Sequence, residues 1–221
     1  MTRTLIATLK ERYFLALREP NFVFSFILSL FLLGGGFYAN YLAGSYATEI
    51  ASNSVTDIFL SNIPVYNVDD IFVYGPIIFW SIISLYCLYH PKKMPFWLKT
   101  VALFIVIRSL FMTLTHIGPF PDHVNLDSFA LFSNFNMYIF SSGGDLFFSG
   151  HTGLPFLLGL IFWDNFKIRI FCIISAVFFG IVVLLGHLHY TIDVLAAFFI
   201  TYSIYNIAVQ IFPADFKRFN S

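Results

Sequence analysis

The chain has 221 residues, of which 58% are hydrophobic and 11% charged, whereas an ordinary soluble domain carries roughly 25% charged residues. This composition excludes a typical soluble fold, and a formal net charge of zero offers a nucleic acid no basic surface. The distribution of charge along the chain is therefore more informative than its sum.

The first element in chain order is a polar segment at residues 1–21, in which basic side chains alternate with apolar ones. This pattern is typical of a helix that lies on the cytoplasmic surface of a membrane. A basic tail that only sets the topology would explain the same residues equally well. Both interpretations place the segment in the cytoplasm.

Six apolar blocks follow, each near the ~20 residues that a helix needs to cross ~30 Å of hydrocarbon. The fourth block is short, and we expect it to borrow a turn from the segment before it. The chain is thus predicted to be an all-α membrane protein, a six-transmembrane-helix bundle forming a single domain at residues 22–212. The blocks are Phe22 to Ala43, Ile71 to Tyr89, Phe96 to Ile117, Phe148 to Trp163, Ile170 to Leu188 and Tyr190 to Phe212.

Charged residues divide the connections between these blocks into two sets. Lys and Arg occur before the first block, at residues 92–99 and 167–169, and in the tail at residues 213–221. The long connections at residues 44–70 and 118–147 contain Asp and Glu but neither Lys nor Arg. By the positive-inside rule, both termini and the tail are predicted to be cytoplasmic in an integral, multi-pass protein.

Polar residues gather at two places, residues 143–152 and 186–193, each where an even-numbered block begins. Both of these blocks enter the membrane from the non-cytoplasmic side, so their first turns are expected at one depth. A helix start offers unpaired backbone N–H groups and the positive end of the helix dipole, and glycines let an anion approach closely. The two clusters therefore predict a phosphate site built from backbone.

Two histidines and an aspartate carry the candidate chemistry, namely His151, His189 and Asp193. On a helix, His189 and Asp193 would share a face, so the carboxylate can accept a hydrogen bond from one imidazole nitrogen. The other nitrogen can then attack phosphorus while His151 protonates the departing oxygen. Such a phosphoryl transfer requires no metal and no other cofactor.

Other uses of these residues stay open. A single interfacial histidine is often only a satisfied polar residue, although three ionisable groups at one membrane face are costly to keep there. A zinc site would use the same ligands, but no further Cys, His or Glu has the spacing of a ligand. A transporter could relay protons through intramembrane Arg, His and Asp, but the chain lacks repeated halves.

The motif residues resemble those of a known family. The segments Gly144-Asp145, Ser149-Gly150-His151-Thr152 and His187-Leu188-His189-Tyr190-Thr191-Ile192-Asp193 are similar to motifs of the sphingomyelin synthase branch of the PAP2-type lipid phosphatase and phosphotransferase superfamily. The resemblance extends from about Arg108 to Tyr202 and includes Pro119-Phe120-Pro121. Gly143 departs from it, because the animal enzymes have cysteine there, and His116 interrupts a threonine-rich stretch.

The resemblance implies a six-span enzyme that cleaves a phospholipid head-group ester through a phosphohistidine on the non-cytoplasmic side. Its partners would be a membrane phospholipid as donor and ceramide, diacylglycerol or water as acceptor. The catalytic histidines of the family fall on His151 and His189, and its aspartate falls on Asp193.

The rival within the superfamily is a lipid phosphate phosphatase. Phosphatases carry an arginine six positions before the second histidine, where this chain has Val183, and a Lys/Arg-Pro motif upstream. A site that binds a phosphomonoester dianion needs more positive charge than one that binds a singly charged diester. The single cation predicted near the site, Arg108, therefore favours a diester.

Four more residues are candidates for substrate binding: Arg108, Asp145, Ser149 and Gly150. Arg108 lies inside the third block, where a cation costs roughly 2.5–3.5 kcal/mol to insert. It is predicted to contact the phosphate or the active site rather than form a purely structural ion pair. Asp145 could orient a histidine or select a head-group amine, while capping of the next helix explains it almost as well.

The remaining histidines are weaker candidates. His187 lies two residues before His189, and residues two apart on a helix point to different faces, which predicts a supporting or loop role. His116 and His123 have still less to connect them with the site. His90 is cytoplasmic in the predicted topology and therefore lies outside the site.

Overall fold

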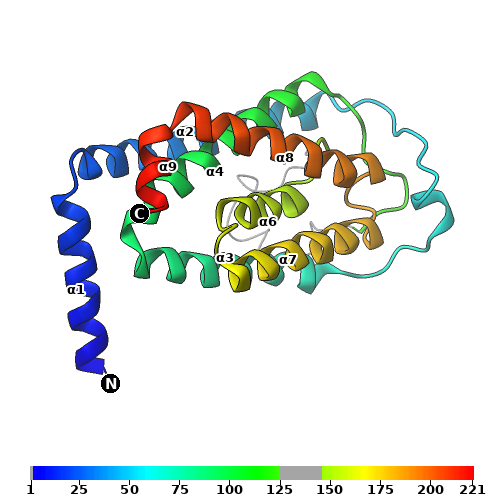
Figure 1. Ribbon diagram of the computed structural model, residues 1–221. Helices are drawn as coiled ribbons and strands as arrows, with labels where there is room; N and C mark the ends of the chain where they lie inside the picture. The colour runs from blue at the N-terminus through cyan, green and yellow to red at the C-terminus, as the bar shows by residue number, and fades with distance from the viewer. Residues whose placement is uncertain (1, 125–145) are drawn as a thin grey trace.

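The computed structural model describes residues 2–124 and 146–221 (Figure 1). Within these residues it contains only helices, which confirms the all-α prediction. The α-helices are α1 (Thr2–Arg18), α2 (Phe22–Glu49), α3 (Asp69–Tyr89), α4 (Met94–Leu114), α6 (Gly150–Ile161), α7 (Phe166–Leu185), α8 (Thr191–Ile211) and α9 (Pro213–Phe219), and the 3-10 helices are η1 (Leu60–Asn62) and η2 (Pro91–Lys93).

Five helices, α2, α3, α4, α7 and α8, are long and apolar enough to cross a membrane. Their outward faces carry large exposed apolar side chains, such as Phe31 on α2, Leu85 on α3 and Phe199 on α8. Such faces are favourable against lipid but not against water. The helices therefore fit an integral multi-pass membrane protein, while the count of six spans and the cytoplasmic termini stay predictions.

The fourth predicted span corresponds to α6, which has 12 residues and at ~1.5 Å per residue is too short to cross ~30 Å alone. The expectation that it borrows a turn is wrong for Leu146–Ser149, which are not helical. Helix α6 packs against α4, α7 and α8, and Figure 1 shows it in the middle of the bundle. Because its neighbours enclose it, its length need not match the thickness of the membrane.

Helix α4 is the most enclosed of the long helices. In its most apolar window 61% of the residues are buried, against 22–33% in the other four. It contains two buried cations, Lys99 near its start and Arg108 farther along. A central helix can hold such charges because side chains of neighbouring helices, rather than lipid, surround them.

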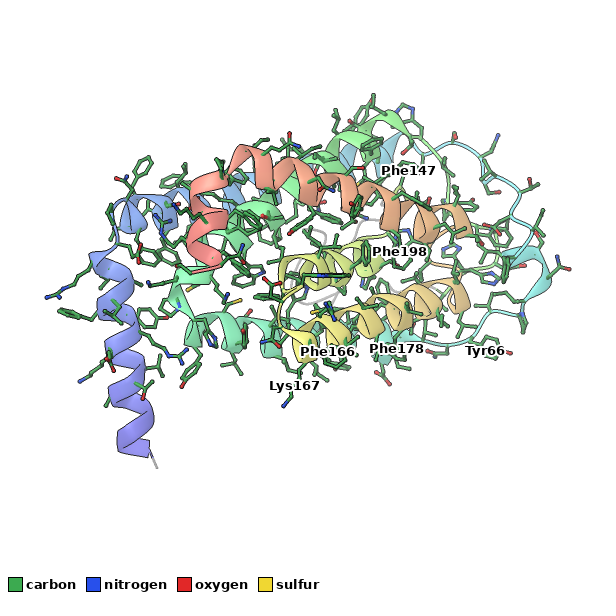
Figure 2. The ribbon with its side chains drawn as sticks, viewed as in Figure 1. Tyr66, Phe147, Phe166, Lys167, Phe178 and Phe198 are labelled. Carbon is green, nitrogen blue, oxygen red and sulfur yellow. The ribbon has the colours of Figure 1, made fainter. Side chains whose placement is uncertain are left out.

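The bundle has two distinct ends (Figure 1). The end that carries α1, η2, α9 and both chain termini is called the terminal end below. The end at which α3, α6 and α8 begin, together with the connections at residues 50–68 and 115–124, is called the loop end. Figure 2 shows Lys167 near the start of α7 and Tyr66 at the loop end.

Helix α1 runs across the direction of the long helices (Figure 1). The chain changes direction at Asn21, whose φ of 61° is in the left-handed region. The helix is attached to the C-terminal end of α3 by two hydrogen bonds, from Arg12 to the carbonyl of Tyr89 at 3.1 Å and from Tyr13 to the carbonyl of Leu88 at 3.1 Å. This orientation is what a helix on a membrane surface would need.

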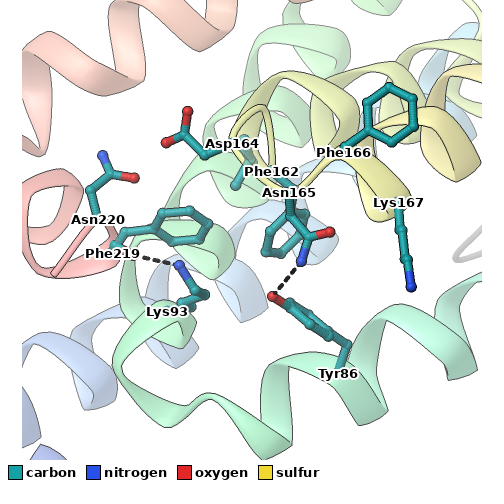
Figure 3. A pocket seen from close by; sticks show the side chains of 10 residues that line it. Tyr86, Lys93, Phe162, Asp164, Asn165, Phe166, Lys167, Phe219 and Asn220 are labelled. Atoms are coloured by element: carbon teal, nitrogen blue, oxygen red, sulfur yellow. Dashed lines mark hydrogen bonds between the residues drawn. The ribbon is translucent and has the colours of Figure 1, made fainter.

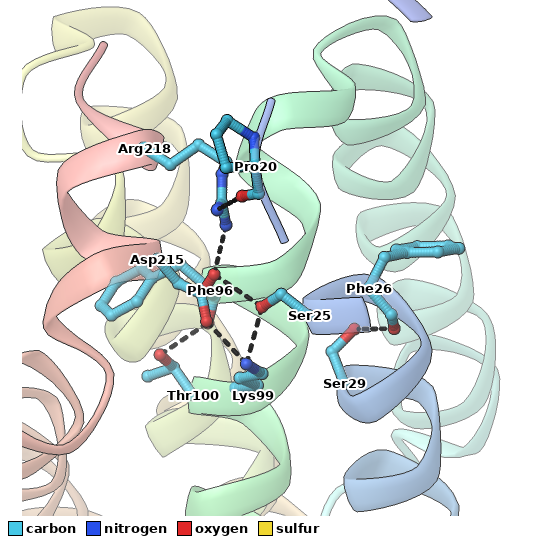
Figure 4. A network of polar contacts seen from close by, with 9 residues as sticks. All are labelled: Pro20, Ser25, Phe26, Ser29, Phe96, Lys99, Thr100, Asp215 and Arg218. Carbon is cyan, nitrogen blue, oxygen red and sulfur yellow. Dashed lines mark hydrogen bonds and ion pairs between the residues drawn. The ribbon is translucent and has the colours of Figure 1, made fainter. Parts of the chain in front are cut away.

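A buried polar network fixes α9 to the bundle at the terminal end (Figure 4). The Lys99 ammonium lies 2.6 Å from Asp215 Oδ2 and donates to the hydroxyl of Ser25 at 2.7 Å. Ser25 in turn donates to Asp215 Oδ1 at 2.6 Å, and Arg218 donates to the same oxygen. The predicted tail thus contains a helix joined to α4 by a buried ion pair and to α2 by a hydrogen bond.

A cavity of about 530 Å³ also opens at the terminal end (Figure 3). The Lys93 ammonium within it donates to the carbonyl of Phe219 at 2.6 Å and lies 4.0 Å above the ring of that residue. Asn165 donates to the hydroxyl of Tyr86 at 3.2 Å. The cavity lies at the C-terminal end of α6, and it is lined by Tyr86, Lys93, Ile161, Phe162, Asp164, Asn165, Phe166, Lys167, Phe219 and Asn220.

Candidate active site

The two polar clusters meet at the loop end. The backbone N–H of Ser149, just before α6, donates a hydrogen bond of 3.1 Å to the carbonyl oxygen of Asp193 in the first turn of α8. Ser149 is fully buried and its hydroxyl accepts from the N–H of Thr152 at 3.4 Å, as an N-cap residue does. The starts of α6 and α8 therefore lie side by side, as the sequence predicts.

His189 and Asp193 are in contact, with 3.4 Å between His189 Nδ1 and Asp193 Oδ2. This distance is long for a hydrogen bond, although catalytic hydrogen bonds are often long without substrate. The expected reason for the contact is wrong, because His189 precedes α8 and does not share a helix face with Asp193. A capping turn brings them together: Asp193 Oδ2 also accepts the N–H of Tyr190 at 3.0 Å.

His151 is the second residue of α6, and its ring stacks on Phe72 of α3 with centroids 4.1 Å apart. The ring is close enough to both His189 and Arg108 for their positive charges to act on it. Helices α3, α4, α6 and α8 therefore all contribute to the surroundings of the candidate site. No local feature of the sequence connects Phe72 with His151, and sequence reasoning missed it.

Arg108 reaches the start of α6. Its Nε donates to the carbonyl of Phe148 at 2.8 Å, and one terminal nitrogen lies 3.3 Å from the sulfur of Met112. A Cβ atom added to Gly150 would lie 3.3 Å from Arg108 Nε, so glycine leaves room for the guanidinium against the helix start. The structure thus places Arg108 beside the first turn of α6.

The start of α8 provides fewer free amides than the sequence suggested. The N–H of Thr191 donates to Asp57 Oδ2 at 2.7 Å, the N–H of Tyr190 donates to Asp193, and the N–H of Asp193 donates to the carbonyl of Tyr190 at 3.0 Å. In α6, the Ser149 hydroxyl accepts the N–H of Thr152, and the amides of Gly150 and His151 have no carbonyl one turn earlier within the helix. An anion would therefore sit at the start of α6, beside Arg108, and the backbone phosphate site stays a prediction.

The two connections at the loop end cover Tyr190, whose side chain is almost completely buried. Its hydroxyl donates to the carbonyl of Gly118 at 2.8 Å and accepts the N–H of Val55 at 3.2 Å. The N–H of Gly118 also donates to the carbonyl of Asn53 at 3.2 Å, which joins the two connections. Together they fix the turn that separates His189 from α8.

Asp57 in the first of these connections is a second residue that sequence reasoning missed. Both of its oxygens accept hydrogen bonds from Thr191, and one also accepts the N–H groups of Phe59 and Leu60. Burial alone would raise the pKa of Asp57, but these hydrogen bonds lower it below the usual aspartate value. Asp57 and Thr191 are 134 positions apart, so no spacing rule could have paired them.

Residues 142–210 match the family model described as PAP2 superfamily C-terminal. This match supports the PAP2-type superfamily. It suggests a lipid enzyme of the phosphatase or phosphotransferase type, and the matched segment contains His151, His189 and Asp193. No curated protein and no solved structure matches the chain significantly. The finer resemblance to the sphingomyelin synthase branch stays a prediction.

The segment that matches the family model also contains His187, which anchors a loop. Its Nδ1 donates to the carbonyl of Asp122 at 2.7 Å, and its ring packs edge-on against Phe120. Its φ of 52° is unusual for a residue other than glycine and turns the chain between α7 and α8. This contact joins the segment to the connection before it.

The remaining candidate residues either make their hydrogen bonds away from the His189–Asp193 pair or lie outside the residues that the structure describes. His116 and His123 have exposed rings that hydrogen-bond to the carbonyls of Thr113 and Phe120, and His90 lies at the terminal end. Gly143, Gly144 and Asp145 lie outside the described residues. Within the residues that are described, no group of three His, Cys, Asp or Glu side chains is arranged to hold a metal ion.

Proposed function

We propose that the protein cleaves the bond between phosphorus and the lipid oxygen of a membrane phospholipid and transfers the phosphorylated head group to ceramide, diacylglycerol or water. The observation that supports this most is the hydrogen bond from Ser149 to Asp193, because it brings the start of α6 to the His189–Asp193 pair. Two imidazoles, one of them with a carboxylate on its Nδ1, are the groups that a phosphohistidine mechanism needs. The match to the PAP2-type model points to the same class of chemistry.

In the first step, Nε2 of His189 attacks phosphorus, and the bond between phosphorus and the diacylglycerol oxygen breaks. His151 gives a proton to that oxygen, so diacylglycerol leaves as a neutral alcohol. Asp193 accepts a hydrogen bond from Nδ1 of His189, which directs attack to Nε2 and stabilises the positive charge on the phosphorylated ring.

In the second step, the hydroxyl of the acceptor attacks phosphorus, and His151 removes its proton. The bond between phosphorus and His189 Nε2 breaks, and His189 returns to its neutral form with the proton on Nδ1. The product is a new phosphodiester when the acceptor is a lipid alcohol and a phosphorylated head group when it is water. No redox partner is needed in either step.

A singly charged diester suits the charges near the site. Arg108 beside Gly150 provides one positive charge at the start of α6, where Ser149 and Gly150 would line the phosphate. Val183, which occupies the position of the additional arginine in phosphatases, is completely buried on α7. By the positive-inside rule the loop end faces the non-cytoplasmic side, so the donor would come from that leaflet.

The decisive experiment compares purified wild type with His189→Ala in liposomes that contain either a labelled phosphodiester lipid or phosphatidate. We expect wild type to release diacylglycerol from the diester and His189→Ala to release none. His90→Ala, which removes a histidine at the terminal end, is the matched control and should retain turnover. Retained turnover in His189→Ala would refute the mechanism.

The same experiment separates the remaining interpretations. Release of inorganic phosphate from phosphatidate, with no reaction of the diester, would identify a lipid phosphate phosphatase instead. Movement of an intact lipid or ion without covalent change would identify a transporter. Addition of ceramide followed by lipid mass spectrometry then shows whether a lipid alcohol or water is the acceptor.

A further inference from the structure

We propose that Asp57 is a positioning residue that fixes the His189 side chain relative to Asp193 for catalysis. Its effect on turnover rests on the function proposed above, whereas its effect on the local structure does not. Asp57 belongs to the connection between α2 and α3, outside the segment that matches the PAP2-type model. The N-terminal part of the chain would then contribute to a site whose reacting groups come from the C-terminal part.

The Asp57 carboxylate accepts four hydrogen bonds and uses both of its oxygens. Oδ2 accepts the N–H of Thr191 at 2.7 Å, and Oδ1 accepts the Thr191 hydroxyl at 2.9 Å. Oδ1 also accepts the N–H of Phe59 at 2.9 Å and the N–H of Leu60 at 3.1 Å. An asparagine has one oxygen and a donor amide in place of the other oxygen, so it cannot make the same set.

The bonds to Thr191 act at the point where α8 begins. Thr191 is the first residue of α8 and lies midway between His189 and Asp193 in sequence. Asp57 therefore anchors the turn from outside, while Asp193 closes it from inside through the N–H of Tyr190. Both anchors are needed to fix the direction of the His189 side chain relative to Asp193.

A small displacement of this turn would matter. The distance of 3.4 Å between His189 Nδ1 and Asp193 Oδ2 is already near the limit for a hydrogen bond. A shift of a few tenths of an ångström in the first turn of α8 would break it and leave the tautomer of His189 undefined. Reactions of this kind are sensitive to such shifts because misplacement by ~1 Å can cost on the order of 100-fold in rate.

The kinetic test uses Asp57→Asn in purified, folded protein, with Asp70→Asn as the matched control. Asp70 is an exposed carboxylate in the first turn of α3 at the same end of the bundle. We expect Asp57→Asn to lower kcat on the order of tenfold while KM changes less than about twofold. Asp70→Asn should change neither. If Asp57 only stabilised the fold, the folded fraction of Asp57→Asn would keep its kcat, and the proposal would be overturned.

Hydrogen exchange of the backbone amides at residues 189–193 provides a readout that does not depend on activity. We expect these amides to exchange faster in Asp57→Asn and at the wild-type rate in Asp70→Asn. Unchanged exchange in Asp57→Asn would overturn the proposal even if turnover fell. If wild type turned over no lipid at all, the proposed function would fail, and the exchange rates alone would still decide whether Asp57 holds the turn.

Discussion

The two ends of the molecule bury charge in different ways. At the terminal end, Lys99 meets the carboxylate of Asp215 directly, with 2.6 Å between the charged atoms. At the loop end, Asp57 and Asp193 accept backbone N–H groups, and Arg108 donates to a backbone carbonyl. The carboxylate at the first end meets two cations, Lys99 and Arg218, whereas neutral backbone groups are among the partners of the charges at the second end.

This difference indicates that the terminal end stabilises the fold and that the loop end acts on the ligand. A direct buried ion pair stabilises one arrangement of α2, α4 and α9, and it leaves little charge to act on a ligand. A charge that is held in place by neutral backbone groups keeps its field and can still act on a phosphate or an imidazolium. Substitutions at the loop end should therefore reduce turnover most, and those at the terminal end should reduce stability.

The largest expected effect is on turnover in Asp193→Asn. The amide cannot stabilise a charged imidazole on His189, and it can present a donor to Nδ1, which favours the wrong tautomer. We expect kcat to fall on the order of 10⁴-fold, since the comparable change in a catalytic triad has about that effect. The measurement is head-group release from a diester lipid in liposomes.

Asp215→Asn is the matched control for Asp193→Asn, because it makes the same chemical change in a buried carboxylate at the other end. We expect the folded fraction of Asp215→Asn to turn over lipid at the wild-type kcat. Equal losses of kcat in both variants would contradict the division between the two ends.

The largest expected effect on stability comes from Lys99→Met. Removal of Lys99 breaks a buried ion pair and leaves the Asp215 carboxylate with Arg218 as its cation, and breaking such a pair typically costs about 3–5 kcal/mol. The double variant Lys99→Met with Asp215→Leu should cost less than the single change, because the buried carboxylate is removed together with Lys99, while Arg218 keeps its hydrogen bond to the carbonyl of Pro20. The free energy of unfolding in detergent micelles is the quantity to measure, and a double variant less stable than Lys99→Met would contradict this account.

The sequence predicted those features that depend on composition and local pattern. Long apolar stretches indicated the helical bundle, and the position of the two polar clusters indicated that the starts of α6 and α8 would lie together. Arg108 was expected near the site because a cation is costly inside a span, and it does lie beside Gly150.

The sequence could not predict contacts between segments that are far apart in the chain. The bonds between Asp57 and Thr191, and the stacking of Phe72 on His151, depend on how the helices pack and leave no periodic signal. Lys99 was expected only to set the topology, because its pairing with Asp215 depends on the docking of α9. Tertiary packing, rather than local pattern, determines each of these contacts.

A moderate effect is expected for Gly118→Ala at the loop end. A Cβ atom at Gly118 would lie 2.2 Å from the backbone carbonyl oxygen of Ser52, so the two connections would have to separate. We expect a loss of about 1–3 kcal/mol in the free energy of unfolding, as in other overpacked sites. Turnover should also fall, because the carbonyl of Gly118 accepts the hydroxyl of Tyr190.

Gly34→Ala is the control for this substitution. Gly34 lies in α2, and nothing would lie within 4 Å of an added Cβ atom. Alanine is the better helix former by up to about 1 kcal/mol, so this variant should be as stable as wild type or more stable. A Gly118→Ala variant that behaves like Gly34→Ala would show that the connections are not packed as described.

The smallest expected effect is a dependence of stability on pH that comes from Asp57. Its hydrogen bonds hold the folded-state pKa below the unfolded value of about 3.9, so its contribution is complete above that pH and disappears as the pH falls through the folded-state pKa. Wild type should therefore be more stable than Asp57→Asn by about 1 kcal/mol at pH 7, the usual size of a capping interaction, and by progressively less below pH ~4. A difference that stays constant from neutral to acidic pH would mean that the Asp57 charge is not what Thr191 binds, and the loop end would then differ from the terminal end in geometry alone.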